Sequence, residues 1–370
     1  MIRLPAVLLL VATLVAGCAR SRPAFEPVAG GVAEVSAADR AAGEALYPFQ
    51  GPTRQWGYMD VGGRVAVTPS FDAAAPFIEG RAKVRVGDAY GFIDPTGVLV
   101  VPARFTSAEA FSHGRALVTE GEDTSMRYGF VDAAGTVVVP LVLPLARSYR
   151  EGLALVRFRD LNLTWFERIF KPSGSESTGF LGLDGEVVFD LPGEATSFSE
   201  GLAPFSEPSL LTPGRWGYVR PDGSVAIPPS FRGTAFRFSN GLARVTQDGA
   251  FGFVDSTGQA AFGETYELAH AFDEGRAAVR VDGRWGYIDT SGALRVAARF
   301  ERAGPFSEGL AAVAVGGLWG FVDLEGEVVI DPSFTAAQAF SKGLAYVTDS
   351  AGSYYIDRSG QPVRPLLAPR

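Results

Sequence analysis

The feature that most constrains this chain is a dipeptide, an aromatic residue followed by glycine, that returns about every 35 residues along most of the sequence. Seven clear copies begin at Trp56, Tyr90, Tyr128, Trp216, Phe251, Trp285 and Trp319. Two degenerate copies begin at Thr178 and Tyr354, where the spacing expects them, which makes nine units. Such self-similarity is typical of solenoids, propellers and related repeat proteins, which act mostly through surfaces rather than through one buried reaction centre.

The residues around each dipeptide predict short antiparallel strands. In the unit around Trp319, stretches rich in Val, Ala and aromatic residues occupy 307–313, 319–323 and 328–330, a composition typical of β-strands. The recurring Asp-x-x-Gly element, Asp323 to Gly326 in this unit, combines a carboxylate that accepts backbone hydrogen bonds with a Gly that tolerates positive φ. We therefore expect a three-stranded antiparallel meander in each unit.

The same unit suggests how its faces are used. Because side chains alternate along a strand, Gly320 faces away from Trp319 and is expected to leave room for a bulky side chain of a neighbouring unit. Residues 328–330 are all apolar, which predicts that the third strand is covered on both faces. Glu308 occupies a position that holds His, Asn or Lys in other units, so this position is expected to tolerate any polar residue.

A single meander is marginally stable in water, so stacking of the units must supply the core. Two all-β architectures fit a tandem array of about nine meanders. We favour an open superhelical, solenoid-like stack, because nine units exceed the usual four to eight propeller blades and propeller blades usually have four strands. Whole units at both chain ends also give no sign of a blade shared between the termini. A closed propeller-like ring is the alternative.

The Trp-Gly-Tyr/Phe-Val/Ile-Asp segment, the following Asp-x-x-Gly turn and the Glu-Gly-Leu-Ala-x-Val segment resemble the WG-repeat family. The resemblance extends over roughly residues 43–365, and the unit around Thr178 departs from it most, since it has Gly182 in place of Asp. The resemblance implies a tandem β-repeat module for which no general activity or catalytic residue set is assigned.

The amino terminus has the layout of a secretory signal. Arg3 precedes an apolar run, 4–15, that is too short for an ordinary transmembrane helix and ends in small residues. Cys18, three residues after the end of this run, is the only cysteine in the chain. A Cys directly after two small residues resembles a bacterial lipobox, in which the thiol is lipidated and becomes the first mature residue. An ordinary signal peptide with a coincidental Cys is the alternative.

These features divide the chain into segments. We expect a lipoprotein signal peptide at 1–17, a lipidated Cys with a flexible tether at 18–42, the repeat array at 43–365 and a short tail at 366–370. The lipid would anchor the protein in the cell envelope. In an organism with two membranes, Ala19 favours the outer membrane, facing either the periplasm or the cell surface.

Composition and motifs argue against several classes of function. The net charge of −8 and the absence of a Lys/Arg cluster argue against nucleic acid as a partner. The two histidines, His113 and His270, have no second ligand nearby in sequence, so we expect no metal, no cofactor and no enzymatic activity. The repeated turn carboxylates could bind calcium or act as an acid and base, and the aromatic residues could stack on sugars, but turn formation and core packing explain both patterns. The carboxylates in question are Asp255, Asp289 and Asp323.

The regularity breaks most strongly at an insertion of residues 158–177. Insertions in repeat proteins map to loops on one edge, often the binding edge, and this one combines aromatic and basic residues in the manner of an interface anchor. The candidate partner-binding residues are Trp165, Phe166, Arg168, Phe170 and Lys171. A short segment that folds back to cap the defective fourth unit is an equal alternative.

The sequence thus predicts a non-catalytic, lipid-anchored envelope protein whose array serves as a protein-binding or scaffolding surface, with an envelope protein as partner. A module that binds cell-wall or surface glycan is the main alternative. A glycan-active enzyme that uses a pair of carboxylates is a third possibility.

Overall fold

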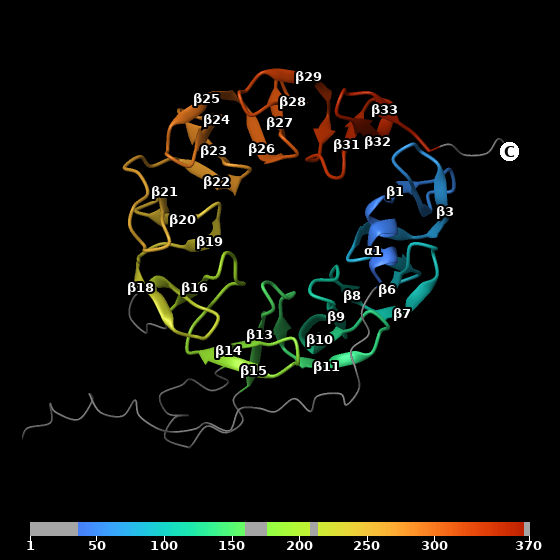
Figure 1. Ribbon diagram of the computed structural model, residues 1–370, viewed down its shortest axis with the longest axis horizontal. Coiled ribbons are helices and arrows are strands. Elements are labelled where there is room, and N and C mark those ends of the chain that lie inside the picture. Colours follow the sequence, from blue (N-terminus) through green and yellow to red (C-terminus); the bar gives the residue numbers. More distant parts are fainter. Residues whose placement is uncertain (1–35, 160–175, 208–213, 366–370) are drawn as a thin grey trace, which may run out of the picture.

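The computed structural model describes residues 36–159, 176–207 and 214–365. These residues form 33 β-strands, the helix α1 (Ala37–Glu44) and the 3-10 turn η1 (Asp123–Ser125). The strands build nine small antiparallel sheets that surround a central opening (Figure 1). The sheets follow one another in chain order, and we number them as blades 1 to 9.

Blades 1, 5 and 6 have three strands and the other six have four. The three-stranded blades are blade 1, with β1 (Tyr47–Gln50), β2 (Trp56–Met59) and β3 (Val65–Phe71); blade 5, with β16 (Ala203–Ser206), β17 (Trp216–Val219) and β18 (Val225–Phe231); and blade 6, with β19 (Ala235–Ser239), β20 (Leu242–Gln247) and β21 (Ala250–Val254). The first three four-stranded blades are blade 2, with β4 (Ala73–Ile78), β5 (Arg81–Val86), β6 (Ala89–Ile93) and β7 (Leu99–Phe105); blade 3, with β8 (Ser107–Ala108), β9 (Ala116–Glu120), β10 (Arg127–Val131) and β11 (Val137–Leu143); and blade 4, with β12 (Leu145–Ala146), β13 (Ala154–Arg159), β14 (Glu176–Leu181) and β15 (Val187–Leu191). The last three are blade 7, with β22 (Leu268–Asp273), β23 (Arg276–Val281), β24 (Arg284–Asp289) and β25 (Leu294–Phe300); blade 8, with β26 (Arg302–Ser307), β27 (Leu310–Val315), β28 (Leu318–Val322) and β29 (Val328–Phe334); and blade 9, with β30 (Ala336–Ala337), β31 (Leu344–Asp349), β32 (Gly352–Asp357) and β33 (Pro362–Val363).

The prediction of three strands per unit is therefore wrong for the four-stranded blades. The additional strand is the innermost one, and it comes from the segment between paired aromatic residues. In blade 8 it is β26, which pairs with β27. Its sequence includes Gly304 and Pro305, which indicate a loop, but Pro is tolerated at the edge of a sheet.

The preference for an open stack is also wrong, because the nine blades close into a propeller-like ring (Figure 1). No strand is shared between the two ends of the chain, as the sequence predicts. Closure instead depends on side chains between blades 9 and 1. The Tyr47 and Tyr355 rings meet edge to face with centroids 5.6 Å apart, and Phe49, Met59 and Leu344 complete this cluster.

All the remaining pairs of neighbouring blades are held together by an equivalent aromatic contact. In each case an aromatic side chain from the middle of one blade meets the edge or face of an aromatic residue on the inner segment of the next blade, with ring centroids 4.8 to 5.0 Å apart. Tyr287 and Phe306 form this pair between blades 7 and 8. Edge-to-face pairs of this kind each contribute about 0.5–1.5 kcal/mol beyond their area burial, so the core runs continuously around the ring.

The Asp-x-x-Gly turns also join successive blades. Gly326 has a φ of 87°, and a Cβ built on it would lie 2.6 Å from Cγ1 of Val296 in the preceding blade. Gly is needed here both for its positive φ and for the close approach. The same contact recurs at Gly97, Gly135, Gly185, Gly223, Gly258, Gly292 and Gly360.

The Gly of the aromatic–Gly dipeptide has a different role from the predicted one. A Cβ built on Gly320 would lie 2.4 Å from the carbonyl oxygen of Ile330 and 2.7 Å from the nitrogen of Pro332, both in the outer strand of the same blade. The register shifts at this point of the β28–β29 pairing. The Gly therefore admits the backbone of the adjacent strand at a bulge, not a side chain of a neighbouring blade.

Helix α1 precedes β1 and packs against β4 and β5, the inner strands of blade 2. The Ser36 side chain caps its amino terminus by accepting the N–H of Asp39 at 3.0 Å. Asp39 forms an ion pair with Arg81 of blade 2 at 3.3 Å, and Gly43 packs against the Phe77 ring. The helix begins inside the 18–42 segment that the sequence predicts as a flexible tether.

Candidate functional site

The inner hairpins of the ring end in two-residue turns with an unusual sequence. Glu308 and Gly309 form the turn between β26 and β27, with φ angles of 56° and 77°. Positive φ at both positions defines a type I′ turn, which prefers Asn-Gly. Glu is an uncommon choice at positive φ, yet it recurs at Glu79, Glu151, Glu200, Glu274 and Glu308.

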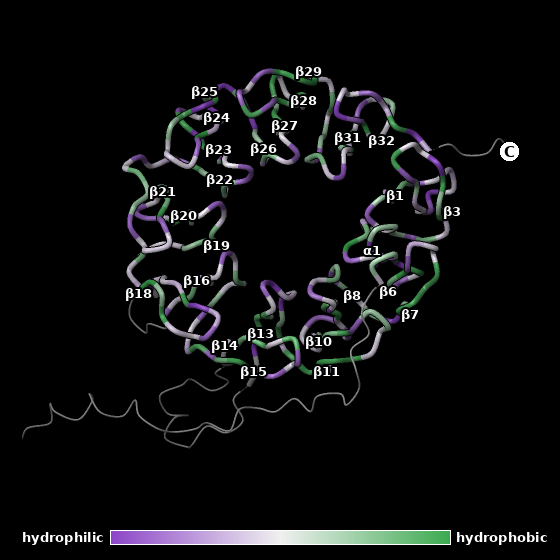
Figure 2. Tube along the Cα trace, in the orientation of Figure 1, coloured by the Kyte–Doolittle hydropathy of each residue, from purple (hydrophilic) through white to green (hydrophobic). Residues whose placement is uncertain are grey.

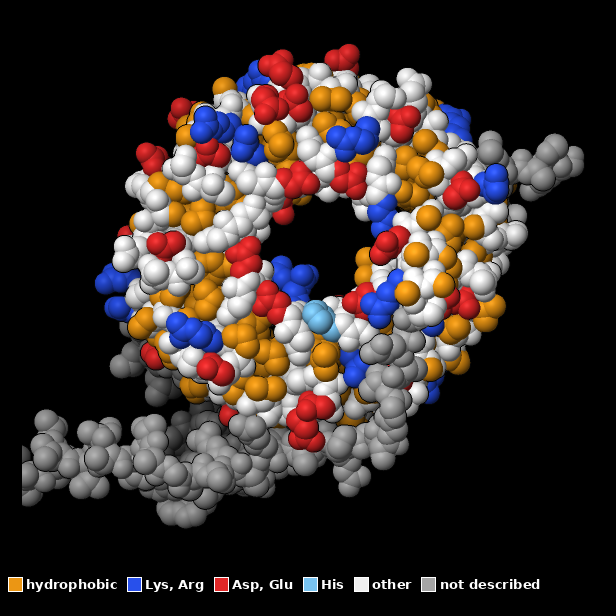
Figure 3. Space-filling view, viewed as in Figure 1, with side chains coloured by type: hydrophobic (Ala, Val, Ile, Leu, Met, Phe, Trp, Pro, Cys, Tyr) orange, Lys and Arg blue, Asp and Glu red, His pale blue; other side chains and the backbone are white. Residues whose placement is uncertain are grey.

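The structure shows why an acidic residue occupies these turns. The carboxylate of Glu274 accepts the N–H groups of Glu308 and Gly309 in the next blade, both at 2.7 Å. The chain repeats this contact around the ring: Glu79 accepts from His113 and Gly114, Glu151 from Glu200 and Gly201, Glu200 from Asn240 and Gly241, Asn240 from Gly275, and Glu308 from Gly343. We call these contacts, in which a Glu or Asn side chain of one turn accepts backbone N–H groups of the next turn, the rim clamps. Figure 3 shows acidic side chains gathered around the central opening.

The expectation that this position tolerates any polar residue is therefore wrong for these blades, because an acceptor at this position joins the two turns. Sequence reasoning missed the rim clamps. The signal that could have found them was the repeated Glu before Gly, in a turn type where Asn is ordinarily preferred.

The carboxylates of the Asp-x-x-Gly elements have the predicted role in turns. Oδ1 of Asp255 accepts the N–H groups of Thr257 at 2.9 Å and Gln259 at 3.1 Å. The Thr257 hydroxyl also donates to it, and these hydrogen bonds hold the pKa of Asp255 below its ordinary value. Asp289 and Asp323 bond the corresponding backbone groups. No group of three or more His, Cys, Asp or Glu suited to a metal occurs in the described part of the chain.

The two histidines lie in separate places. His113 occupies a rim turn, where its backbone N–H donates to Glu79 at 2.8 Å. His270, on β22, is half-buried with its ring 4.8 Å from that of Trp285. Burial and then the nearby charge of Arg244 lower the pKa of His270.

The Trp residues of the dipeptides pack against the core, as the sequence predicts. Trp56, Trp216, Trp285 and Trp319 are half-buried, and each lies against a cluster of buried side chains. They are therefore part of the packing between and within blades.

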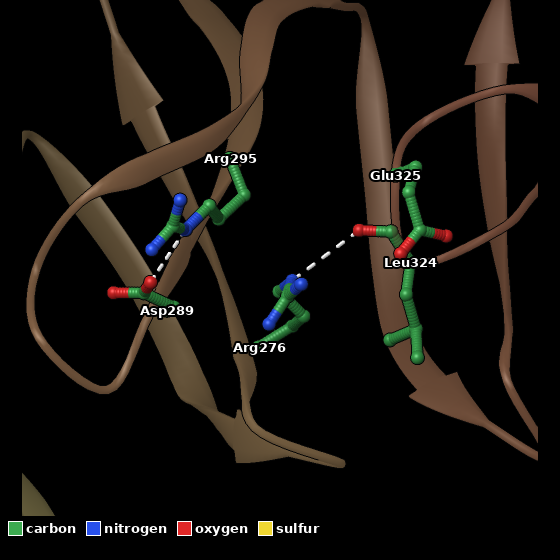
Figure 4. A pocket seen from close by; sticks show the side chains of 5 residues that line it. All are labelled: Arg276, Asp289, Arg295, Leu324 and Glu325. Atoms are coloured by element: carbon green, nitrogen blue, oxygen red, sulfur yellow. Dashed lines mark hydrogen bonds and ion pairs between the residues drawn. The ribbon is translucent and has the colours of Figure 1, made fainter.

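The described surface includes hollows in two places along blades 6 to 8. One, of about 380 Å³, lies between blades 7 and 8 and is lined by Arg276, Asp289, Arg295, Leu324 and Glu325. Figure 4 shows that both of its arginines have partners: Arg295 meets Asp289 at 2.5 Å, and Arg276 donates to the Leu324 carbonyl at 3.3 Å. The other, of about 560 Å³, lies mainly along blade 6, where residues 262–265 follow β21.

Apolar residues recur along the outer circumference of the ring (Figure 2). Val328 and Val329 on β29 are 51% and 45% exposed, whereas Ile330 is 8% exposed. The prediction that this strand is covered on both faces is wrong, because blades diverge with distance from the ring centre and neighbours no longer cover the outer strand. Val98, Leu99, Val142, Leu183, Val188, Val225 and Leu294 are exposed in the same way.

The outer strands also have free edges, and most of the long ones contain Pro. The seven-residue outer strands β3, β7, β11, β18 and β29 carry Pro69, Pro102, Pro140, Pro228 with Pro229, and Pro332 respectively. The equivalent strand β25 has none. Pro lacks a backbone donor and protects an edge against pairing with other chains.

The geometry of β25 shows which of its groups face outward. The carbonyl oxygen of Val296 and the nitrogen of Ala298 both lie against Gly286 of β24, within the blade. Because backbone groups alternate along a strand, the N–H and C=O of Ala297 face away from the blade. Within the described residues no further strand pairs with β25.

The other predicted site residues lie outside the described residues. These are Cys18 and the candidate partner-binding residues Trp165, Phe166, Arg168, Phe170 and Lys171. Among the described residues, the structure contains no helix long and apolar enough to cross a membrane.

Solved structures that match this chain include a eukaryotic initiation factor and BamB from Moraxella catarrhalis. The initiation factor is 11% identical with a TM-score of 0.56, and the match covers 86% of this chain and 95% of that chain. BamB is 13% identical with a TM-score of 0.38, covering 88% of this chain and 96% of that chain. At these identities the likeness to the initiation factor shows the fold alone. No curated protein matches the sequence.

The family model described as WG containing repeat matches seven segments: 56–88, 90–122, 128–161, 216–249, 251–285, 285–319 and 319–349. The seven matches begin at or next to the seven clear aromatic–Gly dipeptides and together cover more than half of the chain. The chain therefore belongs to the WG-repeat family.

Proposed function

We propose that this protein is a non-catalytic scaffold of the cell envelope, anchored by lipid on Cys18, that binds an envelope protein through the outer edge of its ring. The observation that carries the proposal is the open edge of β25. This strand retains every backbone donor, whereas β7, β11 and β18 have Pro at the position of Ala297 and so lack the outward N–H.

The chemistry of a free strand edge selects the kind of partner. An extended segment of another protein can add to the edge as a further strand, with main-chain hydrogen bonds supplying affinity. Ala297 presents its N–H and C=O outward, and the exposed Leu294 lies on the same strand. A partner segment with alternating apolar residues would pair with Ala297 and cover Leu294.

The ring suits a scaffold because its blades are joined all the way round. Aromatic pairs and rim clamps link successive blades, so a partner bound at β25 would be held at a constant position relative to the rest of the ring. A lipid on Cys18 would keep this assembly at a membrane, since multiple acyl chains make anchoring stable.

The repeat itself supplies a matched pair of substitutions to test the proposal. Ala297→Pro places Pro where β7, β11 and β18 have it and removes an outward N–H. Ala298→Pro places Pro where β3, β18 and β29 have it and removes an N–H that faces Gly286. Both substitutions have precedents in this fold, so both variants should fold.

The mature protein and both variants would be used for affinity capture from detergent-solubilised envelope of the native organism. The proposal predicts that the native protein and Ala298→Pro retain the same protein and that Ala297→Pro loses it with an unchanged melting temperature. Equal retention by all three, or no specific protein on any of them, would contradict binding at this edge. Membrane fractionation of Cys18→Ser would test the anchor independently.

A further inference from the structure

Three arginines stand on the inner segments of two blades, around blade 5. Arg147 and Arg150 follow β12 in blade 4, and Arg237 lies on β19, the innermost strand of blade 6. All three residues are exposed. Figure 3 shows a group of basic side chains inside the central opening, beside the acidic side chains of the rim.

The repeat does not require arginine at any of the three positions. At the position of Arg150, four other blades have a serine whose hydroxyl donates to the backbone carbonyl of the buried aromatic residue in the next blade. These are Ser112, Ser199, Ser239 and Ser307, with partners Tyr149, Phe238, Phe272 and Phe340 at 2.5 to 2.8 Å. In blade 4 this serine is replaced by Arg150, so a guanidinium group is present and the hydroxyl contact with the next blade is absent.

The other blades have other residues at the positions of the remaining two arginines. At the position of Arg237, immediately before the buried aromatic residue, the other blades have Pro76, Ala110, Ser148, Ser197, Ala271, Pro305 and Ala339. The position of Arg147 holds residues as different as Ala75, Glu109 and Gly304 elsewhere. The fold tolerates many side chains here, so packing does not explain why three arginines occur together.

Hydrogen bonds to blade 5 connect the two segments: Glu151, next to Arg150, accepts the N–H of Glu200, and Ser199 donates to the carbonyl of Phe238, next to Arg237. Partial burial of its side chain is the main cause of the lowered pKa of Arg237, and the charges of Arg150 and Arg147 lower it further. Within the described part of the chain none of the three guanidinium groups forms a hydrogen bond or an ion pair. The nearby rim carboxylates, Glu151 and Glu200, each accept two backbone N–H groups of the next turn.

We propose that Arg147, Arg150 and Arg237 form a binding site, open to the central channel, for a small ligand that carries a multiply charged oxyanion, either a phosphate or a polycarboxylate group. Guanidinium groups bind such oxyanions with paired, charge-assisted hydrogen bonds. Bound anion would offset the repulsion among the three arginines. This site is independent of the proposed protein-binding edge at β25, which lies on the outer side of the ring.

The decisive variant is Arg150→Ser, because it restores the residue that the repeat has in five other blades. A serine here would donate to the carbonyl of Phe198, so the variant should melt at the same or a higher temperature than the native protein. Its loss of anion binding could not then be ascribed to unfolding. Arg237→Ala, also with a precedent in the repeat, is the second variant, and Arg64→Gln, an exposed arginine in a turn of blade 1, is the control.

Inorganic pyrophosphate and citrate would be titrated separately into the mature protein by calorimetry, with sodium chloride at matched ionic strength as the reference. The proposal predicts saturable binding of at least one of them, weakened about tenfold or more by Arg150→Ser and Arg237→Ala and unchanged by Arg64→Gln. The anion bound more tightly identifies the group as phosphate or carboxylate. The proposal is overturned if the native protein shows no saturable binding of either anion, or if the two channel variants bind as tightly as the native protein.

Discussion

Substitution by alanine should affect stability very differently at two glycines that occupy the same position in the repeat. A Cβ on Gly286 of blade 7 would lie 2.5 Å from the carbonyl oxygen of Val296 and 2.7 Å from the nitrogen of Ala298, and both atoms belong to the backbone of β25. A Cβ on Gly252 of blade 6 would have Thr265 Cγ2 at 4.0 Å as its nearest contact. We therefore predict that Gly286→Ala is strongly destabilising and that Gly252→Ala is not.

The magnitude follows from these contacts. Ordinary carbon contacts require roughly 3.5 Å or more, so β25 would have to move by about 1 Å along much of its length. Overpacking of this kind costs about 1–3 kcal/mol, and any loss of pairing between β24 and β25 adds to it. Gly252→Ala keeps an ordinary contact and restricts the unfolded chain, which stabilises by about 0.4–1 kcal/mol. The two variants should therefore differ in free energy of unfolding by about 1.5–4 kcal/mol.

The assay is urea unfolding of the two variants and the native protein, with the Trp residues as fluorescence probes. Hydrogen exchange at amides of β24 and β25 would show whether the effect is local to blade 7. Equal stability of the two variants would refute the reasoning, because it would mean that the approach of the outer strand is not what requires Gly in the dipeptide.

Four further changes test other contacts. Glu274→Ala should lower the free energy of unfolding by about 1–2 kcal/mol in urea, since it removes the acceptor of two rim N–H groups at an exposed position; no change would contradict the rim clamps. Lys342→Met, which removes an Nζ donor to the Phe77 carbonyl, should raise hydrogen exchange in β1 and β31 on the order of tenfold, and uniform exchange across the ring would count against a role in closure. Burial raises the pKa of Tyr287 well above its ordinary 10.0, so its contribution to stability is complete below pH 10 and is lost as pH rises beyond that value. Tyr287→Phe should therefore make the melting temperature less sensitive to pH above 10. An unchanged dependence of the melting temperature on alkaline pH would argue against this. Cys18→Ser should move the protein from the membrane fraction to the soluble fraction, and continued retention would exclude the lipid anchor.

The sequence predicts the local structure well because local structure depends on residues close together in the chain. The spacing of the dipeptides predicts nine units, and Asp255, like its counterparts, forms the expected turn because its carboxylate reaches amides only two and four residues ahead. The antiparallel hairpins follow for the same reason. These features need no knowledge of how one unit lies against another.

The features that the sequence analysis missed depend on contacts between blades or on position in the ring. Glu274 meets its partners 34 and 35 residues away, a distance at which a polar turn residue gives no local sign of an acceptor role. Val328 and Val329 are apolar in sequence, but their exposure depends on lying at the outer circumference. The candidate partner-binding residues of the insertion stay a prediction, because they lie outside the described residues.

Ring closure is encoded in the units that depart from the repeat. Tyr355 stands where the other dipeptides have Gly. Blade 9 accommodates it because its outer strand, β33, has only two residues and cannot approach as β29 does in blade 8. The Tyr355 ring then meets Tyr47 of blade 1, whose hydroxyl donates to the carbonyl of Lys342. The substitution that makes the last unit look degenerate thus supplies the aromatic contact at the ninth junction, where neither chain end contributes a strand to the other blade. An open stack would leave Tyr47 and Tyr355 exposed at opposite ends, so these two residues are the part of the sequence that favours a ring.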